Sequence, residues 1–186
     1  MAIAHTAPQS YPLLRSEYAA LVERGVFDGA HVELLEGRIV SMSPIGGPHR
    51  YGVCRLGEIL TRALPGRAVV YIQSSFLTPR ESQPEPDIAV VPLGDYLDQP
   101  PATAYLIVEV AESSLSTDRL VKARLYAAAG VPEYWIVNLV KEVVEVYTAP
   151  GPEGYARMAE HGRGVALAVP SFEDVVVRVE DVLPPR

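Results

Sequence analysis

Residues 105–137 read YLIVEVAESSLSTDRLVKARLYAAAGVPEYWIV, and this stretch decides the fold. It opens with Tyr105–Val110, a nearly continuous apolar and β-branched run that is typical of a strand buried on both faces. It closes with a second run of the same kind, Tyr134–Val137. A helix of about 13 residues fits between them, and a strand–helix–strand unit predicts two parallel neighbouring strands joined by a crossover.

Local signals mark the two ends of that helix. Ser116 or Thr117 is predicted to cap its N-terminus, and the helix is predicted to run to Ala129. Gly130 supplies the stop, and Pro132 follows just beyond it.

Working outward, the flanking segments complete an α/β architecture. Glu36-Gly37 lies between two short strand patterns and predicts a hairpin, because glycine readily takes the positive φ of a tight turn. We also predict a helix that Ser16 caps and that ends at Glu23, a Gly/Pro-rich bend, a second helix, two strands and a set of antiparallel C-terminal segments. Their ranges are Pro44–Pro48 (bend), Arg50–Leu64 (helix), Ala68–Leu77 and Ile88–Val91 (strands), then Glu142–Tyr147, Tyr155–Glu160 and Val165–Val169, with Val175–Val179 as a last strand or short helix.

The prediction is therefore a single α/β domain over residues 1–186, with a mixed sheet, helices on its faces and an antiparallel C-terminal extension. The chain has 186 residues, 16 Lys+Arg and 23 Asp+Glu, for a net charge of −7. Residues 1–10 resemble no leader peptide, and no apolar run is long enough for a membrane helix. Cys54 is the only cysteine, which excludes an internal disulfide and fits a reducing, cytoplasmic compartment.

The charge is unevenly distributed. Eight acids and no Lys or Arg lie between Glu81 and Asp118, whereas residues 50–67 carry four arginines and one acid. The net charge argues against tight non-specific binding of nucleic acid. A divalent cation in the acidic centre, beside an arginine-bearing helix, would still allow a phosphate backbone to be cut. Most of the acids are also explained as solvated loop residues.

Two of these acids form a candidate metal site. Asp87 begins one predicted strand and Glu109 ends another, and antiparallel pairing about the intervening loop would place them nearly opposite each other. Two such carboxylates suit Mg²⁺ or Mn²⁺, and a metal would compensate Glu109 within its apolar strand. The alternative is structural: Glu109 marks the exposed end of its strand, and Asp87 caps a turn.

Lys122 is the candidate cation of the site. It is one of only two lysines among sixteen basic residues and lies on the helix that follows the Glu109 strand. Its ammonium group could reach the carboxylates to orient a nucleophilic water or to stabilise a phosphorane. The alternative is an ordinary surface pair with Asp118 four residues earlier.

These residues resemble a known pattern. Pro86-Asp87, followed by Glu109-Val110-Ala111, is similar to the PD-(D/E)XK nuclease signature without its lysine in the usual place. The surrounding strings narrow the resemblance to the Uma-type restriction endonuclease family over about residues 15–147. They are VELLEGR (32–38), PDIAVV (86–91), VEVAESS (108–114), DRLVK (118–122) and GVPEYWIV (130–137).

The resemblance implies a restriction-endonuclease-like core and Mg²⁺- or Mn²⁺-dependent hydrolysis of phosphodiester bonds, with DNA as the nucleic-acid partner. It implies that Asp87, Glu109 and the carbonyl of Val110 bind the metal. Lys122 would replace the lysine missing at position 111, and Glu33 would be an additional acid of the catalytic set.

Substrate contacts are assigned more loosely. His49 is a candidate to hydrogen-bond a phosphate or the acids of the site, and it is equally well explained as a helix cap. Gln73 would contact the substrate or satisfy a buried polar neighbour, and Arg50 and Arg55 would contact the substrate from their helix. Tyr126 is assigned to packing.

Three functions remain open from the sequence. The first is a metal-dependent nuclease, which as a restriction-type enzyme would act as a homodimer. The second is a catalytically inactive nuclease fold that binds nucleic acid or protein, and the third is a metal-dependent hydrolase of small phosphodiesters.

Overall fold

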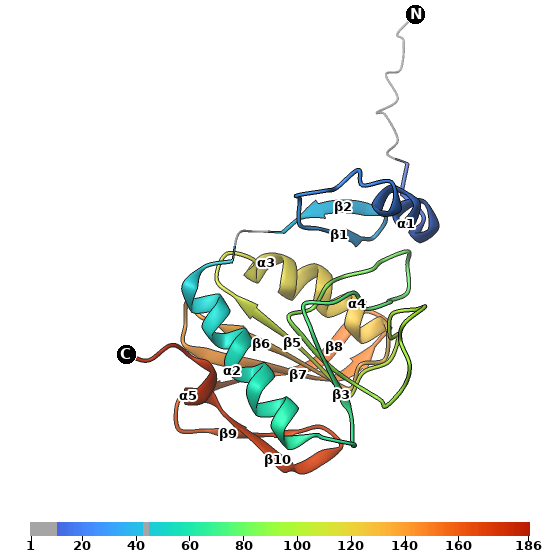
Figure 1. The fold of residues 1–186 in the computed structure, drawn as a ribbon. Coiled ribbons are helices and arrows are strands. Elements are labelled where there is room, and N and C mark those ends of the chain that lie inside the picture. Colours follow the sequence, from blue (N-terminus) through green and yellow to red (C-terminus); the bar gives the residue numbers. More distant parts are fainter. Residues whose placement is uncertain (1–10, 43–44) are drawn as a thin grey trace, which may run out of the picture.

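The centre of the computed structural model, which describes residues 11–42 and 45–186, is a six-stranded mixed sheet of order β3-β4-β5-β6-β7-β8 (Figure 1). β5 and β6 are parallel, and every other neighbouring pair is antiparallel, so the predicted crossover is confirmed. The strands are β3 (Val69–Ile72), β4 (Ile88–Val91), β5 (Leu106–Ala111), β6 (Glu133–Asn138), β7 (Val143–Gly151) and β8 (Gly154–Gly162).

The crossover helix is continuous but not uniform. It consists of α3 (Leu115–Thr117), a π-helical turn η1 (Asp118–Lys122) and α4 (Ala123–Ala128). The predicted caps are wrong, because the helix already begins at Leu115 after Ser114. The stop is confirmed, since Gly130 has a φ of 74° just beyond the helix.

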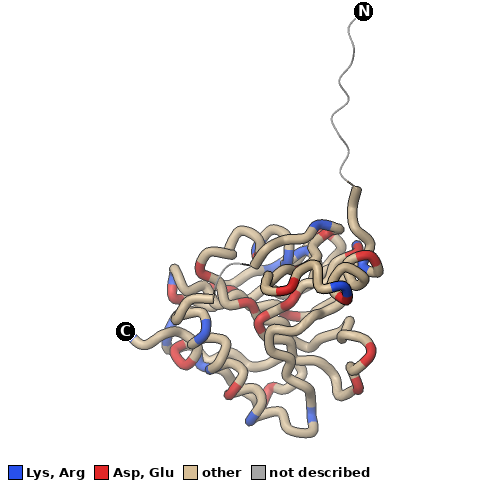
Figure 2. Tube along the Cα trace, turned by 45° about the horizontal axis from the view of Figure 1, so that its top comes forward, with Lys and Arg blue, Asp and Glu red and all other residues tan. Residues whose placement is uncertain are grey.

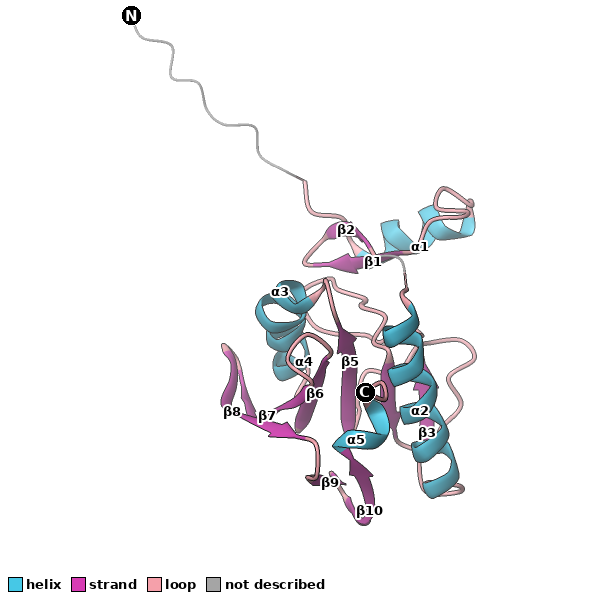
Figure 3. Cartoon of the chain, turned by 90° about the vertical axis from the view of Figure 1, so that its left-hand side faces the viewer, coloured by secondary structure: helices cyan, strands magenta, loops and turns pink. Residues whose placement is uncertain are grey.

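Two layers cover the sheet (Figure 3). On one face lie α2 (Gly47–Ala63), α5 (Val179–Val182) and the hairpin of β9 (Ala166–Val169) and β10 (Phe172–Arg178). On the other face lies the crossover helix. Each layer buries its own apolar cluster against the sheet.

Strand alternation decides which face each side chain reaches. On β5, Val108 and Val110 pack into the cluster under α2, whereas Ile107 and Ala111 pack into the cluster under the crossover helix. Glu109 has the parity of the second pair. It therefore points to the crossover helix from a strand that is buried along its whole length.

The N-terminal elements lie over the end of the sheet where β5 stops (Figure 1). They are α1 (Arg15–Glu23) and the hairpin of β1 (Val32–Leu35) and β2 (Arg38–Ser41). The predicted hairpin turn is confirmed, with φ values of 48° at Glu36 and 72° at Gly37. Ser16 is not the cap of α1, because the helix already starts at Arg15 and Glu17 accepts the backbone N–H of the N-cap residue Leu14 at 2.8 Å.

Two further predictions need correction. α2 begins at Gly47, so Gly47 and Pro48 belong to the helix and not to a bend, because proline is well tolerated in a first turn. Pro44 lies outside the described residues. At the C-terminus, β9 pairs with β10 in a separate hairpin and does not extend the main sheet, because its apolar residues Leu167 and Val169 pack beneath α2.

None of the helices formed by residues 11–42 and 45–186 has the length and apolar character needed to cross a membrane. The leader-peptide question concerns residues 1–10, which lie outside the described part of the chain.

Candidate active site

A cavity of about 170 Å³ opens where the β1–β2 hairpin, the start of α2, the start of β4, the end of β5 and the start of the crossover helix meet. Figure 2 shows acidic positions gathered in the middle of the molecule, beneath the N-terminal elements. Seven residues singled out by the sequence line this cavity: Glu33, His49, Gln73, Asp87, Glu109, Val110 and Lys122.

Asp87 is held at the entrance to β4 by three donors. His49 Nε2 lies 3.0 Å from Oδ2, Gln73 Nε2 donates to Oδ1 at 3.2 Å, and the backbone N–H of Val110 donates to Oδ2 at 2.9 Å. The predicted strand register is confirmed, because Ile88 lies opposite Val108 and this register brings Asp87 level with Glu109.

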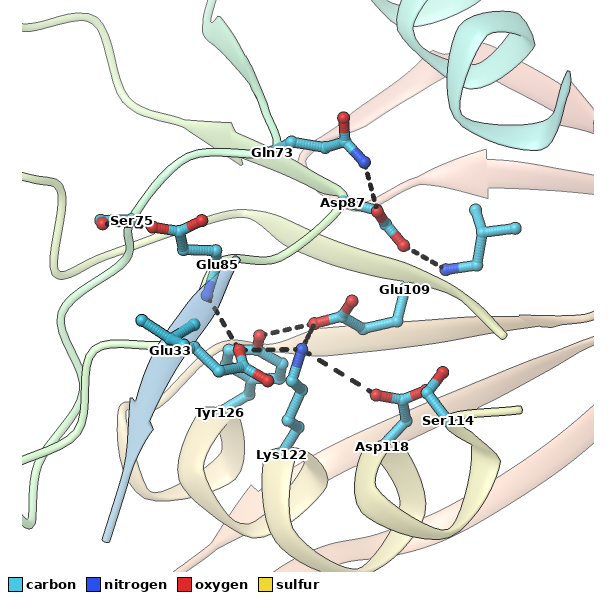
Figure 4. A network of polar contacts seen from close by, with 12 residues as sticks. Glu33, Gln73, Ser75, Glu85, Asp87, Glu109, Ser114, Asp118, Lys122 and Tyr126 are labelled. Atoms are coloured by element: carbon cyan, nitrogen blue, oxygen red, sulfur yellow. Dashed lines mark hydrogen bonds and ion pairs between the residues drawn. The ribbon is translucent and has the colours of Figure 1, made fainter. Parts of the chain in front are cut away.

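Glu109 receives two side-chain donors on the same oxygen (Figure 4). Lys122 Nζ lies 3.0 Å from Oε1, and the hydroxyl of Tyr126 donates to Oε1 at 2.8 Å. No hydrogen bond from another described residue reaches Oε2. Tyr126 is thus more than a packing residue, and its polar role corrects the sequence-based assignment.

Lys122 links three elements of the fold. Besides Glu109 on β5, its ammonium contacts Glu33 Oε2 on β1 at 3.1 Å and Asp118 Oδ1 one turn earlier at 4.0 Å (Figure 4). The side chain is 5% exposed. The surface-pair alternative for Lys122 and Asp118 is therefore wrong, because both side chains are buried in the site.

The excess of carboxylates around one ammonium group shifts the pKa values of the site. Burial lowers the pKa of Lys122, but the charges of Glu109, Glu33 and Asp118 together raise it by more. The net shift of this pKa is upward, so the amine stays protonated. Burial also raises the pKa of Glu109 well above its usual range, against the opposing effect of Lys122. It raises the pKa of Asp118 to about 6, with Lys122 and the Ser114 hydroxyl acting in the other direction.

The pKa of His49 is shifted as well. Burial lowers the pKa of its imidazole, but the hydrogen bond and the charge of Asp87 raise it more, and the net shift is upward. Its Nδ1 is buried and has no hydrogen-bond partner among the described residues. His49 therefore belongs to the site and does not cap α2.

Sequence reasoning named Lys122 but missed that it belongs to a polar stripe on the crossover helix. Ser114, Asp118, Lys122 and Tyr126 recur every four positions, and three of them line the cavity while Tyr126 bonds Glu109 beneath it. The regular four-residue spacing of polar groups was the available signal.

Arg50 and Arg55 stay outside the cavity. Arg50 donates to the carbonyl of Ile45, and Arg55 pairs with Glu58 on its own helix.

The fold agrees with what comparison finds. A family model named Uma2, described as "Putative restriction endonuclease", matches residues 15–180. The chain belongs to the Uma2 family. A crystal structure from Anabaena variabilis ATCC 29413, titled as a "putative nuclease belonging to DUF820", shares the fold of this Uma2 chain with a TM-score of 0.72 and 15% identity, over 92% of this chain and 97% of that one. A search of curated proteins found no match for this Uma2 chain.

Restriction-endonuclease-like families generally use divalent metal ions. Within the described residues, no three His, Cys, Asp or Glu side chains are grouped as a metal cluster. The oxygen donors of Asp87, Glu109 and the Val110 carbonyl nevertheless suit a hard cation, because Mg²⁺ commonly uses one or two carboxylates and keeps waters or substrate phosphates as its other ligands.

Proposed function

We propose that this Uma2 protein is a divalent-metal-dependent nuclease that hydrolyses phosphodiester bonds in DNA. One observation carries the proposal. The buried ammonium of Lys122 lies 3.0 Å from Glu109, and the Asp87 carboxylate enters the same cavity from the adjoining strand. Two strand-end carboxylates and a lysine facing one cavity suit phosphodiester hydrolysis.

Asp87, Glu109 and the carbonyl of Val110 are the residues that would hold Mg²⁺ or Mn²⁺. When bound, the metal supplies a Lewis acid for the phosphate and lowers the pKa of a coordinated water. The protein pre-orients its own ligands. Asp87 is fixed by Gln73, His49 and the N–H of Val110, and Glu109 by Lys122 and Tyr126.

Lys122 supplies positive charge at the scissile phosphate. Because its pKa is raised, it acts as a hydrogen-bond donor that orients the attacking water or stabilises charge that develops on the phosphate, and it does not act as a base. Glu33 shares the ammonium group from the hairpin side, so it helps to place Lys122. His49 holds Asp87 through Nε2.

The test is plasmid nicking with Mg²⁺ or Mn²⁺. Glu109→Gln and Lys122→Met should each lower the rate by about 100-fold or more, because each removes charge from the reacting centre. Glu160→Gln is the matched control, since Glu160 lies on β8 and pairs with Lys141 outside the cavity. Equal nicking by the wild type and both site variants would contradict the proposal.

A second candidate is a nuclease fold without catalysis that binds nucleic acid or protein. It is favoured by the internal pairing of the site, because Lys122 already pairs with both Glu109 and Glu33 while Gln73 and His49 contact Asp87. Calorimetry distinguishes the two. Mg²⁺ or Mn²⁺ binding that is lost in Glu109→Gln supports the nuclease, whereas no binding at millimolar metal supports the second candidate.

Cleavage of both DNA strands would need two copies of the site, and a homodimer remains our prediction. Light scattering of the purified protein, with and without duplex DNA, measures the number of chains. A monomer in both conditions would restrict the proposed activity to nicking.

A further inference from the structure

The π-helical turn over Asp118–Lys122 brings four polar side chains of the crossover helix onto one face. Its signature is the backbone bond from the N–H of Ala123 to the carbonyl of Asp118, five residues back. In an α-helix four residues overshoot a full circle by about 40°, so positions 114 and 126 would point about 120° apart. A π-turn takes up one extra residue and reduces this difference to about 20°. Ser114, Asp118, Lys122 and Tyr126 therefore share one face.

A π-turn is rare and needs tertiary contacts to hold it. On the inner side, Lys122 is bound to Glu109 and Glu33. Outside the cavity, Arg119 donates to Glu145 of β7 with two nitrogens, through Nε at 3.0 Å and through Nη2. Glu145 is completely buried, although the catalytic proposal gives it no role.

Glu145 is itself rigidly placed. The amide of Asn138 donates to Oε1 at 2.7 Å, and the hydroxyl of Tyr147 donates to Oε2 at 2.9 Å. Together with Arg119 these donors occupy both carboxylate oxygens. The arrangement gives the guanidinium group a fixed, bidentate acceptor.

Glu145 and Glu109 occupy one row of the sheet. Glu109 on β5 lies opposite Ile136 on β6, and Ile136 lies opposite Glu145 on β7. Strand spacing puts the two glutamates about 10 Å apart, and their parity directs both toward the crossover helix. The helix is thus fastened to one row of the sheet at two points, by Lys122 on Glu109 and by Arg119 on Glu145.

We propose that Arg119 and Glu145 are positioning residues that hold the π-turn and thereby place the Lys122 ammonium at Glu109. The catalytic consequence rests on the proposed nuclease function. The placement itself does not. Loss of the Arg119–Glu145 pair should let the turn relax toward an α-helix and rotate Lys122 away from Glu109.

The sequence offers a direct readout, because Lys122 and Lys141 are the only lysines. In wild type, reductive methylation followed by peptide mass spectrometry should modify the exposed Lys141 quickly and the buried Lys122 slowly. Arg119→Met should raise the Lys122 rate by about tenfold or more, and Arg119→Lys, which keeps the charge without the fork, should restore part of the protection.

The matched control is Arg67→Met. Arg67 also contacts one carboxylate with two nitrogens: its Nη1 and Nη2 donate to Asp174 of β10 at 2.7 and 2.8 Å. This pair does not involve the crossover helix. Arg67→Met should therefore leave Lys122 protected. If Arg119→Met loses its cooperative melting, the double variant Arg119→Met/Glu145→Gln takes its place, because it removes the buried charge together with its partner.

Unchanged protection of Lys122 in the folded Arg119 variant overturns the proposal. Nicking assays add the catalytic consequence: kcat should fall about tenfold in Arg119→Met, because the Lys122 ammonium is displaced from the reacting phosphate, and Arg119→Lys should recover part of it. Methylation needs neither metal nor DNA. A wild type that protects Lys122 but cuts nothing would therefore refute the nuclease and leave the positioning role intact.

Discussion

At the scale of single residues, Tyr126 shows how an uncharged group shapes an acidic site. Its hydroxyl donates to the same oxygen of Glu109 that Lys122 contacts, and the residue is fully buried. Burial raises its pKa well above 10, and the Glu109 charge adds to this, so the hydroxyl stays a donor. Tyr126 therefore leaves Oε2 as the oxygen of Glu109 that is available to a cation.

We expect Tyr126→Phe to lower Mg²⁺ affinity about 10-fold or more, because hydrogen bonds to ligand carboxylates orient them. Isothermal titration calorimetry measures the change. Tyr155→Phe is the matched control, since the Tyr155 hydroxyl donates to the carbonyl of Val131 and not to the site. Equal affinity in wild type and both variants would show that Tyr126 only packs.

At the scale of elements, the approach of α2 to the sheet depends on Gly52. A Cβ at this position would lie 3.0 Å from Cγ1 of Val110 and 3.2 Å from the carbonyl oxygen of Val182. Glycine lets the helix cross β5 closely, which brings His49 of the first turn to Asp87. The close helix–strand packing thus serves the site as well as the core.

Gly52→Ala should destabilise the protein by about 1–2 kcal/mol, because overpacking outweighs the gain in helix propensity. Urea unfolding measures the loss. Gly47→Ala on the same helix is the control, since a Cβ there meets nothing within 4 Å. A Gly52→Ala protein as stable as wild type would mean that α2 shifts at no cost.

At the scale of the whole molecule, the buried acids of the site should make stability depend on pH. The pKa of Asp118 is about 6 in the folded protein, against 3.8 for an ordinary aspartate. Between these values the folded state holds more protons than the unfolded chain. This group therefore lowers the free energy of unfolding as pH rises from about 4 to 6, by an amount of the order of 3 kcal/mol.

Asp118→Asn should remove that contribution. The free energy of unfolding of the variant minus that of wild type is expected to be larger at pH 7 than at pH 4. Glu109 and Glu33 continue to pair with Lys122 in the variant. Urea unfolding of both proteins at the two pH values gives the comparison. A wild-type-minus-variant difference that is the same at pH 4 and pH 7 would contradict the expectation.

A bound metal should also stabilise the whole molecule. If Asp87 and Glu109 hold Mg²⁺ only in the folded state, metal at 100 times its Kd adds about 2.7 kcal/mol to the free energy of unfolding. The melting temperature of wild type should rise with Mg²⁺ concentration, and that of Glu109→Gln should not. A parallel rise in both proteins would place the binding elsewhere.

Much of this architecture was predictable from local patterns. Buried apolar runs on either side of a helix predict the parallel pair β5–β6, and antiparallel pairing of β4 and β5 about the middle of their connecting loop predicts the register that brings Asp87 level with Glu109. The helix cap was predicted wrongly, because Ser114 directs its hydroxyl to the carboxylate of Asp118 at 2.6 Å and the helix starts ahead of Ser116.

The sequence by itself therefore determined the parallel strand pair with its crossover helix and the register that brings Asp87 level with Glu109, since hydrophobic periodicity and turn residues act over short distances along the chain. Only the tertiary structure decided the π-turn, the Tyr126 hydroxyl on Glu109 and the anchoring of Arg119 on Glu145. The physical reason is that the partner of Arg119 in this turn is Glu145, 26 residues away on strand β7. No local pattern specifies that distant partner.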